Sequence, residues 1–158
     1  MIGAKALGVL LILAVGGIAA KAGATREQEK LTVLDAWLGL LLYLRGQIDC
    51  YLLPLDEIFR GADKELLRAA SAGREAETWD DLLHASLPHL GKESARLLTA
   101  LMRELGSSYR EEQLRRCDYY LSALEKERDR LAAALPARQK LCVASCLCTA
   151  LGTAILLW

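Results

Sequence analysis

The sequence predicts an all-α protein, a helical bundle flanked by N- and C-terminal transmembrane helices. Hydrophobic residues make up 53% of the 158 residues, which excludes a simple disordered chain. Aromatic residues are only 6% and there are three prolines, a composition that favours helices over strands. Charge is concentrated in the middle of the chain, so the two apolar ends are candidate membrane anchors.

The two ends have the length and composition of membrane-spanning helices. The first segment, 1–24, contains an apolar run at 6–20 between two lysines, whose flexible stems can extend the usable span. The second segment, 141–158, has no charged residue. Because about 20 apolar residues are enough to cross a bilayer as a helix, we expect one transmembrane helix at each end. Residues 25–140 then form the domain between the two anchors.

Positive charges beside the second segment predict how the chain is oriented. Arg138 and Lys140 precede this segment and no base follows it. Positive residues prefer the cytoplasmic side, so the domain should face the cytoplasm and both termini should lie on the opposite side. One alternative stays open, because Ala22-Gly23-Ala24 imitates the small-residue cleavage site of a signal peptide. Cleavage there would leave a secreted, tail-anchored helical domain.

The domain between the anchors is predicted to consist of helices alone. Residues 25–53 are apolar almost all round, which is typical of a helix at the centre of a bundle. A third membrane span there is disfavoured, because only 37–44 is free of charge, about a third of the length needed. Two short helices are expected next, one starting at Pro54 and one over 65–71. A third should start after Thr78 as its N-cap, and a fourth should cover 92–105 with Gly106 as its C-cap. The last helix should start at 107–109 and run to Pro136, which should kink or break it.

The expected core positions recur at helical spacing in the two longest of these helices. In the first helix they are Leu31, Leu34, Trp37, Leu38, Leu40, Leu41, Leu42, Leu44 and Ile48. In the last helix they are Leu114, Cys117, Leu121, Leu124, Leu131 and Leu135. Arg128 interrupts the second series.

The sequence contains no motif for catalysis, transport or nucleic-acid binding. Its 20 basic and 20 acidic side chains balance, so bulk positive charge cannot hold nucleic acid. There is no phosphate-binding loop, no G-x-S-x-G and no H-E-x-x-H motif. His84 and His89 are expected at the surface or at the edge of the bundle. We therefore predict a protein that is not an enzyme and has no catalytic residue, cofactor, metal or small-molecule substrate.

Five cysteines support one competing function. Three of them, Cys142, Cys146 and Cys148, crowd into the second apolar segment, and the other two are Cys50 and Cys117. They lack the C-x-x-C spacing and the nearby histidine that are typical of metal sites. The simpler interpretation is that these cysteines act as small apolar residues in a segment where helices pack closely. A membrane thiol or metal sensor that uses the C-terminal cysteines remains the alternative, as does lipidation of Cys142.

Short sequence pieces follow one another in a distinctive order along the whole chain. They are Leu38–Leu44 with Gln47-Ile48, Pro54-Leu55-Asp56-Glu57, Trp79-Asp80-Asp81-Leu82-Leu83, Arg103-Glu104-Leu105-Gly106 and Glu112-Gln113-Leu114. Their order and spacing resemble the stage III sporulation protein AB family of endospore-forming bacteria. In the family, the Leu-Gly break is commonly preceded by Gly-Glu and followed by Asp. Arg103 and Tyr109 stand near those places here.

The resemblance implies a noncatalytic membrane platform in the sporulation channel complex that joins mother cell and forespore. The family's soluble domain is similar to the F-type platform domain of type II secretion systems, which sits beside a cytoplasmic ATPase. The implied partners are the stage III sporulation AA ATPase, other membrane subunits of the complex and the lipid bilayer. The implied location is the mother cell's outer forespore membrane, as a multi-pass protein with its soluble domain in the cytoplasm.

Charged residues of the last soluble helix are the candidates for a partner-binding surface. They are Arg110, Arg115, Arg116, Glu125, Lys126 and Arg128. Pairs such as Glu112 and Arg116 are spaced four apart and also suit a solvated helix face. The sequence alone leaves both interpretations open.

Overall fold

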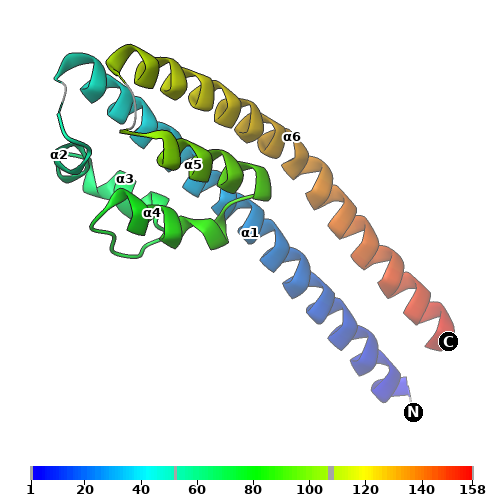
Figure 1. The fold of residues 1–158 in the computed structure, drawn as a ribbon. Helices are drawn as coiled ribbons and strands as arrows, with labels where there is room; N and C mark the ends of the chain where they lie inside the picture. Colours follow the sequence, from blue (N-terminus) through cyan, green and yellow to red (C-terminus); the bar gives the residue numbers. More distant parts are fainter. Residues whose placement is uncertain (1, 52, 107–108, 158) are drawn as a thin grey trace. The chain divides into compact units, whose positions relative to one another are not determined.

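A computed structural model describes the backbone of residues 2–51, 53–106 and 109–157. Side chains are described at residue 23, over 25–51, 53–106 and 109–136, and at 144 and 148. Over this part of the chain the fold is all-helical and contains no strand, as predicted (Figure 1). The elements are α1 (Ile2–Cys50), α2 (Leu55–Arg60), α3 (Lys64–Ala70), α4 (Trp79–Ser86), the 3-10 turn η1 (Leu87–His89), α5 (Lys92–Glu104) and α6 (Arg110–Leu157).

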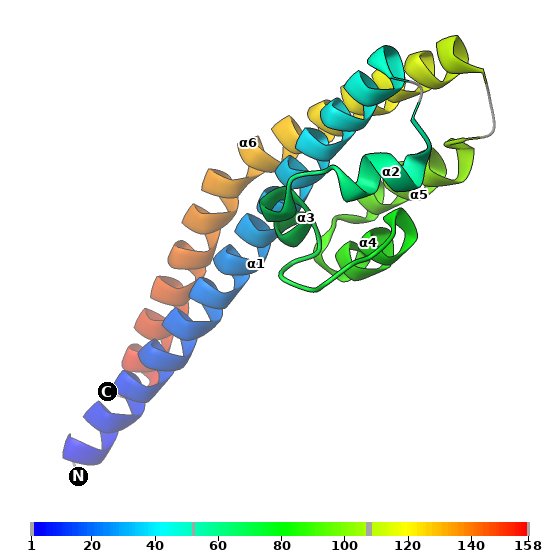
Figure 2. The same cartoon turned by 90° about the vertical axis from the view of Figure 1, so that its left-hand side faces the viewer.

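The chain divides into two compact units. The terminal unit contains Met1–Gln28 and Ala132–Trp158, and the bundle unit contains Glu29–Leu131. In the terminal unit, the start of α1 and the end of α6 are helical and lie side by side (Figure 2). The predicted membrane segments 1–24 and 141–158 belong to this unit. Nearly all their side chains lie outside the described residues, so membrane crossing stays a prediction.

The bundle unit is built around its part of α1, which confirms the expected central helix. Leu34, Trp37 and Leu40 are completely buried, because apolar residues cover almost the whole circumference of this helix. Leu42 was predicted in the core, but its side chain is 55% exposed. The prediction is wrong because Leu42 shares an exposed side of α1 with Asp35 and Asp49, which lie seven residues before and after it.

One helical stretch with described side chains, Thr25–Cys50, is long and apolar enough to cross a membrane. Half of its most apolar window is buried inside the structure. The central helix of a water-facing bundle passes the same test of length and composition. The burial of Leu34, Trp37 and Leu40 accounts for its apolar character without a lipid environment.

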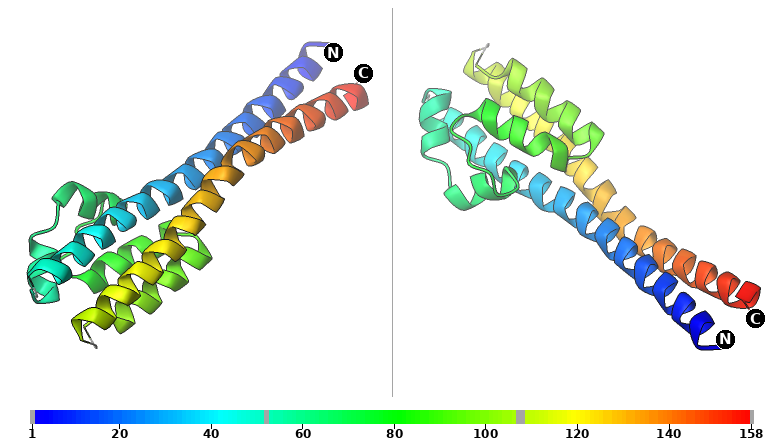
Figure 3. Two further views of the ribbon diagram at one scale, coloured as in Figure 1. Left: turned by 90° about the horizontal axis from the view of Figure 1, so that it is seen from above. Right: turned by 90° about the horizontal axis from the view of Figure 1, so that it is seen from below.

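The other helices of the bundle unit pack around α1. The first part of α6 runs antiparallel beside it, with Cys117, Leu121 and Leu124 buried (Figure 3). Short helices α2 and α4 contribute an aromatic cluster in which Trp79 lies 5.2 Å from Phe59 and 6.4 Å from Trp37, measured between ring centroids. The indole nitrogen of Trp79 donates a 3.0 Å hydrogen bond to the Leu55 carbonyl, so the buried ring keeps its polar atom satisfied.

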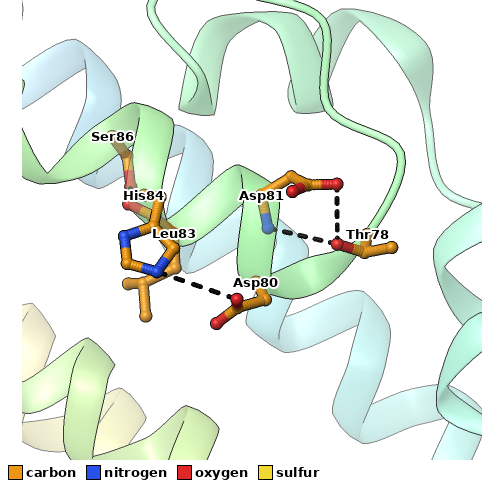
Figure 4. Close-up of polar contacts among 6 residues, drawn as sticks. All are labelled: Thr78, Asp80, Asp81, Leu83, His84 and Ser86. Atoms are coloured by element: carbon orange, nitrogen blue, oxygen red, sulfur yellow. Dashed lines mark hydrogen bonds and ion pairs between the residues drawn. The ribbon is translucent and has the colours of Figure 1, made fainter.

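Local side chains set the ends of the short helices. The Thr78 hydroxyl accepts a 3.1 Å hydrogen bond from the Asp81 amide, which is the predicted N-cap of α4 (Figure 4). Asp63 caps α3 in the same way by accepting from the Glu65 amide at 2.8 Å. Gly106 ends α5 with a φ of +81°, a left-handed conformation that glycine adopts without strain. These observations confirm the expected helix starts and stops.

Of the two outcomes expected at Pro136, a break is wrong, because α6 continues as one helix from Arg110 to Leu157, and a kink stays a prediction. Proline removes a single amide donor, here the one that would bond to the carbonyl of residue 132. Amides on either side can still form their helical hydrogen bonds. The helix continues through Pro136 although the proline ring also crowds the carbonyl of residue 132.

Candidate partner-binding surface

Three ion pairs join α1 to α6 in the bundle unit. Asp35 contacts Arg128 at 2.9 Å, Arg45 contacts Asp118 at 2.5 Å, and Asp49 contacts Arg110 at 2.6 Å. The partner numbers fall along α6 as they rise along α1, which is the register of two antiparallel helices. We call these three pairs the α1–α6 ladder.

The ladder holds two of the predicted partner-binding residues. Arg110 donates both to the Asp49 carboxylate and to the Asp49 backbone carbonyl. Arg128 also reaches Asp129, at 3.2 Å. A guanidinium that is hydrogen-bonded to a carboxylate has a fixed orientation, and its positive charge is partly neutralised. Arg110 and Arg128 therefore contribute to the packing of the bundle, and a partner protein would have to bind side chains that are already paired.

A third predicted residue, Arg116, is also held within the bundle unit. It contacts Glu112 at 2.6 Å, the i,i+4 pair expected from the sequence, and the carboxylate of Glu104 on α5 at 3.6 Å. Its guanidinium therefore connects α6 to the end of α5. Like Arg110 and Arg128, Arg116 is committed to contacts within the protein.

The ion pairs shift the pKa values of three ladder residues, Arg45, Asp118 and Arg128. The hydrogen bond from Arg45 lowers the pKa of Asp118, and the same bond raises the pKa of Arg45. The hydrogen bond to Asp35, followed by that to Asp129, raises the pKa of Arg128. Since these pairs are solvent-exposed, each adds little free energy, but together they favour one register of α6 on α1.

The remaining predicted residues lie on an exposed face of α6. Arg115, Glu125 and Lys126 are exposed, and none of them forms an ion pair with another described side chain. They share this side of the helix with further exposed residues at spacings of three, four and seven. We call this surface the outer face of α6 and define it as Arg115, Tyr119, Ser122, Glu125, Lys126 and Asp129.

Tyr119 is the residue that sequence reasoning missed. Its side chain is 66% exposed, and its ring packs edge-to-face against Tyr120 with centroids 5.2 Å apart. Tyr120 itself is buried, and burial raises its pKa, with Glu104 adding to the effect. Tyr119 lies four residues after Arg115 and seven before Lys126, a helical spacing that could have placed it on the predicted surface.

The histidines lie where the sequence analysis expected them. Asp80 and His84 are exposed neighbours on α4 with 3.7 Å between carboxylate and imidazole (Figure 4). His89 lies near the end of η1 and contacts Glu29 of α1 at 3.0 Å. Among the described residues, no group of His, Cys, Asp and Glu could hold a metal ion. These contacts are therefore surface pairs.

The described cysteines add nothing that favours thiol chemistry. Cys117 is buried, and burial raises the pKa of its thiol, which opposes formation of the reactive thiolate. Cys50 and Cys148 are exposed free thiols. The side chains of Cys142 and Cys146 lie outside the described residues, so the sensor hypothesis stays untested there.

The described residues define an all-helical bundle protein, and the outer face of α6 is its candidate contact surface. The family model described as stage III sporulation protein AB matches residues 5–158. The chain therefore belongs to the stage III sporulation protein AB family, which confirms the resemblance drawn from the sequence pieces. Comparisons with curated proteins and with solved structures gave no match. Family membership makes this a sporulation-associated protein of a family not known as an enzyme.

Proposed function

We propose that this chain is a noncatalytic membrane platform of the sporulation channel complex between mother cell and forespore. In this role, the outer face of α6 docks the stage III sporulation AA ATPase, and the terminal unit anchors the protein beside other membrane subunits. The protein would be multi-pass in the mother cell's outer forespore membrane, with the bundle unit in the cytoplasm. Its bundle would correspond to the F-type platform domain of type II secretion systems.

The outer face of α6 is the observation that carries this proposal. Tyrosine and arginine are the side chains most enriched at the energetic centres of protein interfaces, and this face places Tyr119 four residues from Arg115. Both signs of charge surround the ring, through Glu125 and Lys126. Beside this face, the ladder residues Asp118 and Arg128 are already paired. The ion pairs therefore hold the helix that carries this face in one register on α1 before a partner binds.

The test is a binding measurement between the full-length chain in lipid nanodiscs and the purified ATPase. Tyr119→Ala should weaken binding about tenfold or more, because truncating a central aromatic residue costs over about 1.4 kcal/mol. Arg115→Glu combined with Lys126→Glu should weaken it mainly through slower association. Arg103→Glu is the matched control, since Arg103 is exposed on α5 and lies off the outer face.

Two outcomes would contradict the proposal in different ways. Absence of binding by the wild-type chain, with its fold verified by circular dichroism, would remove ATPase docking. Unchanged affinity of both outer-face variants would place the contact elsewhere on the molecule.

A further inference from the structure

A pocket of about 600 Å³ lies between α2, α3 and the loop that follows α3. We call it the α2–α3 pocket; the elements that form it are labelled in Figure 2. Phe59, Ala62, Leu67 and Ala76 supply its apolar lining, and all four are buried or half-buried. Its volume falls within the range of about 300–1,000 Å³ that is usual for ligand pockets. No residue of α6 lines it, so it is separate from the outer face of α6.

Four cations border the pocket: Arg60, Lys64, Arg68 and Arg74. All four side chains are exposed, and none of them forms an ion pair with another described residue. The contrast with the α1–α6 ladder is clear, because the cations there are matched by carboxylates at 2.5–2.9 Å. The pocket thus combines an apolar interior with unpaired positive charge along α2 and α3.

The wall of the pocket is shaped by an ordered turn after α3. Ala72 and Gly73 both have positive φ, 53° and 85°, which turns the chain sharply away from the end of the helix. The buried Ser71 hydroxyl donates towards the carbonyls of Arg68 and Arg74, at 3.1 and 2.5 Å. A non-glycine residue in the left-handed region persists only where its surroundings hold it, so this wall is formed before any ligand arrives.

We infer that the α2–α3 pocket docks an acidic peptide segment of a partner protein, which inserts one apolar side chain between Phe59 and Leu67 and places carboxylates against Lys64 and Arg68. The four cations favour a peptide with acidic residues on both sides of its apolar side chain, because opposite charges attract. The apolar lining of the pocket favours the apolar side chain itself. Glu75 and Glu77 also line the pocket, so a uniformly anionic lipid surface would meet two carboxylates. A peptide can place its few acids beside Lys64 and Arg68 alone, which favours a peptide over a membrane. The inference stands whether or not the outer face of α6 binds the ATPase.

The inference is tested with the full-length chain in phosphatidylcholine nanodiscs and a fluorescein-labelled peptide. The peptide is rich in Glu and Asp and has one central Leu, and binding is followed by fluorescence anisotropy. We expect saturable binding that weakens with salt, and weaker binding when the acids are replaced by their amides or the Leu by Ser. Arg68→Glu with Lys64→Glu should lower affinity about tenfold or more. Ala76→Trp, which fills the pocket without changing charge, should do the same.

The matched control is Arg103→Glu, because Arg103 and Arg68 are both exposed arginines in the last turn of a helix. This control should bind the peptide as the wild type does, and circular dichroism should show all variants equally helical. Equal affinity of wild type and pocket variants, or no binding by the wild type, would overturn the inference. Binding of short-chain phosphatidylglycerol in place of the peptide would also overturn it and would assign the pocket to lipid headgroups.

Discussion

Two sets of arginine side chains in the bundle unit differ in what surrounds them. Arg45, Arg110 and Arg128 each face a carboxylate on the neighbouring long helix. Arg68 and Arg74 border the α2–α3 pocket without an ion pair to another described residue. The first group stabilises the register of α1 and α6, whereas the second leaves positive charge available to a ligand. Residue type alone does not distinguish the groups.

The Arg45–Asp118 pair predicts a pH-dependent stability difference between wild type and Asp118→Asn. Because Arg45 lowers the pKa of Asp118 in the folded state, the ionised carboxylate stabilises the fold above its ordinary pKa of 3.8. This contribution disappears as pH falls through the lowered, folded-state pKa. Asp118→Asn should therefore unfold at a lower temperature than the wild type at about pH 7, and the difference should shrink as the pH falls below the ordinary pKa of 3.8. The unfolding temperatures of wild type and variant are measured at each pH by circular dichroism during heating of the full chain in detergent.

The matched control for this prediction is Glu125→Gln. Glu125 is an exposed carboxylate on the same helix that forms no ion pair with another described side chain. Its variant should show no comparable pH-dependent difference from the wild type. An equal difference for Asp118→Asn above and below the ordinary pKa of 3.8 would show that the ion pair does not contribute.

At the scale of the helices, short side-chain contacts determine where each element begins and ends. Thr78 and Asp63 satisfy amides at the starts of α4 and α3. Gly106 provides the left-handed residue after α5. Pro136 shows the limit of such local signals, because a helix as long as α6 continues past one missing hydrogen bond.

The N-cap of α4 predicts a specific loss of stability. Thr78→Ala should lower the free energy of unfolding by about 1 kcal/mol, because the Asp81 amide loses its acceptor. Thr78→Ser keeps the hydroxyl and should recover most of that loss. Urea unfolding of the full chain in detergent gives both values. Equal destabilisation by Ala and Ser would show that the methyl group, and not the cap, is responsible.

Two glycines predict opposite responses to the same substitution. Gly106→Ala should destabilise the protein by about 1–2 kcal/mol, since φ is +81° and the added Cβ would lie 3.3 Å from Leu55. Gly46→Ala should stabilise it by about 0.5–1 kcal/mol, because Gly46 lies inside α1 and an added Cβ meets nothing within 4 Å. Chemical unfolding of both variants provides the comparison. The same sign for both would contradict the conformational argument.

For the molecule as a whole, the division into a terminal unit and a bundle unit separates two kinds of environment. The bundle unit has its own apolar core and a surface rich in ion pairs. The terminal unit contains the two apolar segments expected in the membrane. Under the proposed function, the terminal unit would lie in the membrane and the bundle unit in the cytoplasm.

The proposed topology predicts which sites an impermeant thiol reagent can reach. In a cysteine-free background expressed in the plasma membrane of non-sporulating cells, a label site at Glu65→Cys on α3 should be protected in intact cells, and a cysteine added at the C-terminus should react. The positive residues before the second segment are the physical reason, because they favour retention on the cytoplasmic side. Labelling of the Glu65→Cys site would place the bundle outside and restore the signal-peptide alternative.

Much of the fold could be predicted because its signals are local. The cap at Thr78, the stop at Gly106 and the buried series Leu34, Trp37 and Leu40 depend on spacings within one helix. The candidate surface was only partly predictable. Arg115 and Lys126 are exposed as that role requires, whereas Arg110 is engaged by a carboxylate 61 residues away in sequence.

The sequence by itself determined the family, the helical class, most helix boundaries and the central place of α1, because periodicity and capping act over a few residues. The tertiary structure alone decided which charges are free. Asp35 and Arg128 are 93 residues apart in the chain and meet only because α1 and α6 pack antiparallel in one register. The same packing left Leu42 exposed and placed Tyr119 on the outer face of α6. Such outcomes depend on which surfaces meet, and no window of the sequence contains both surfaces.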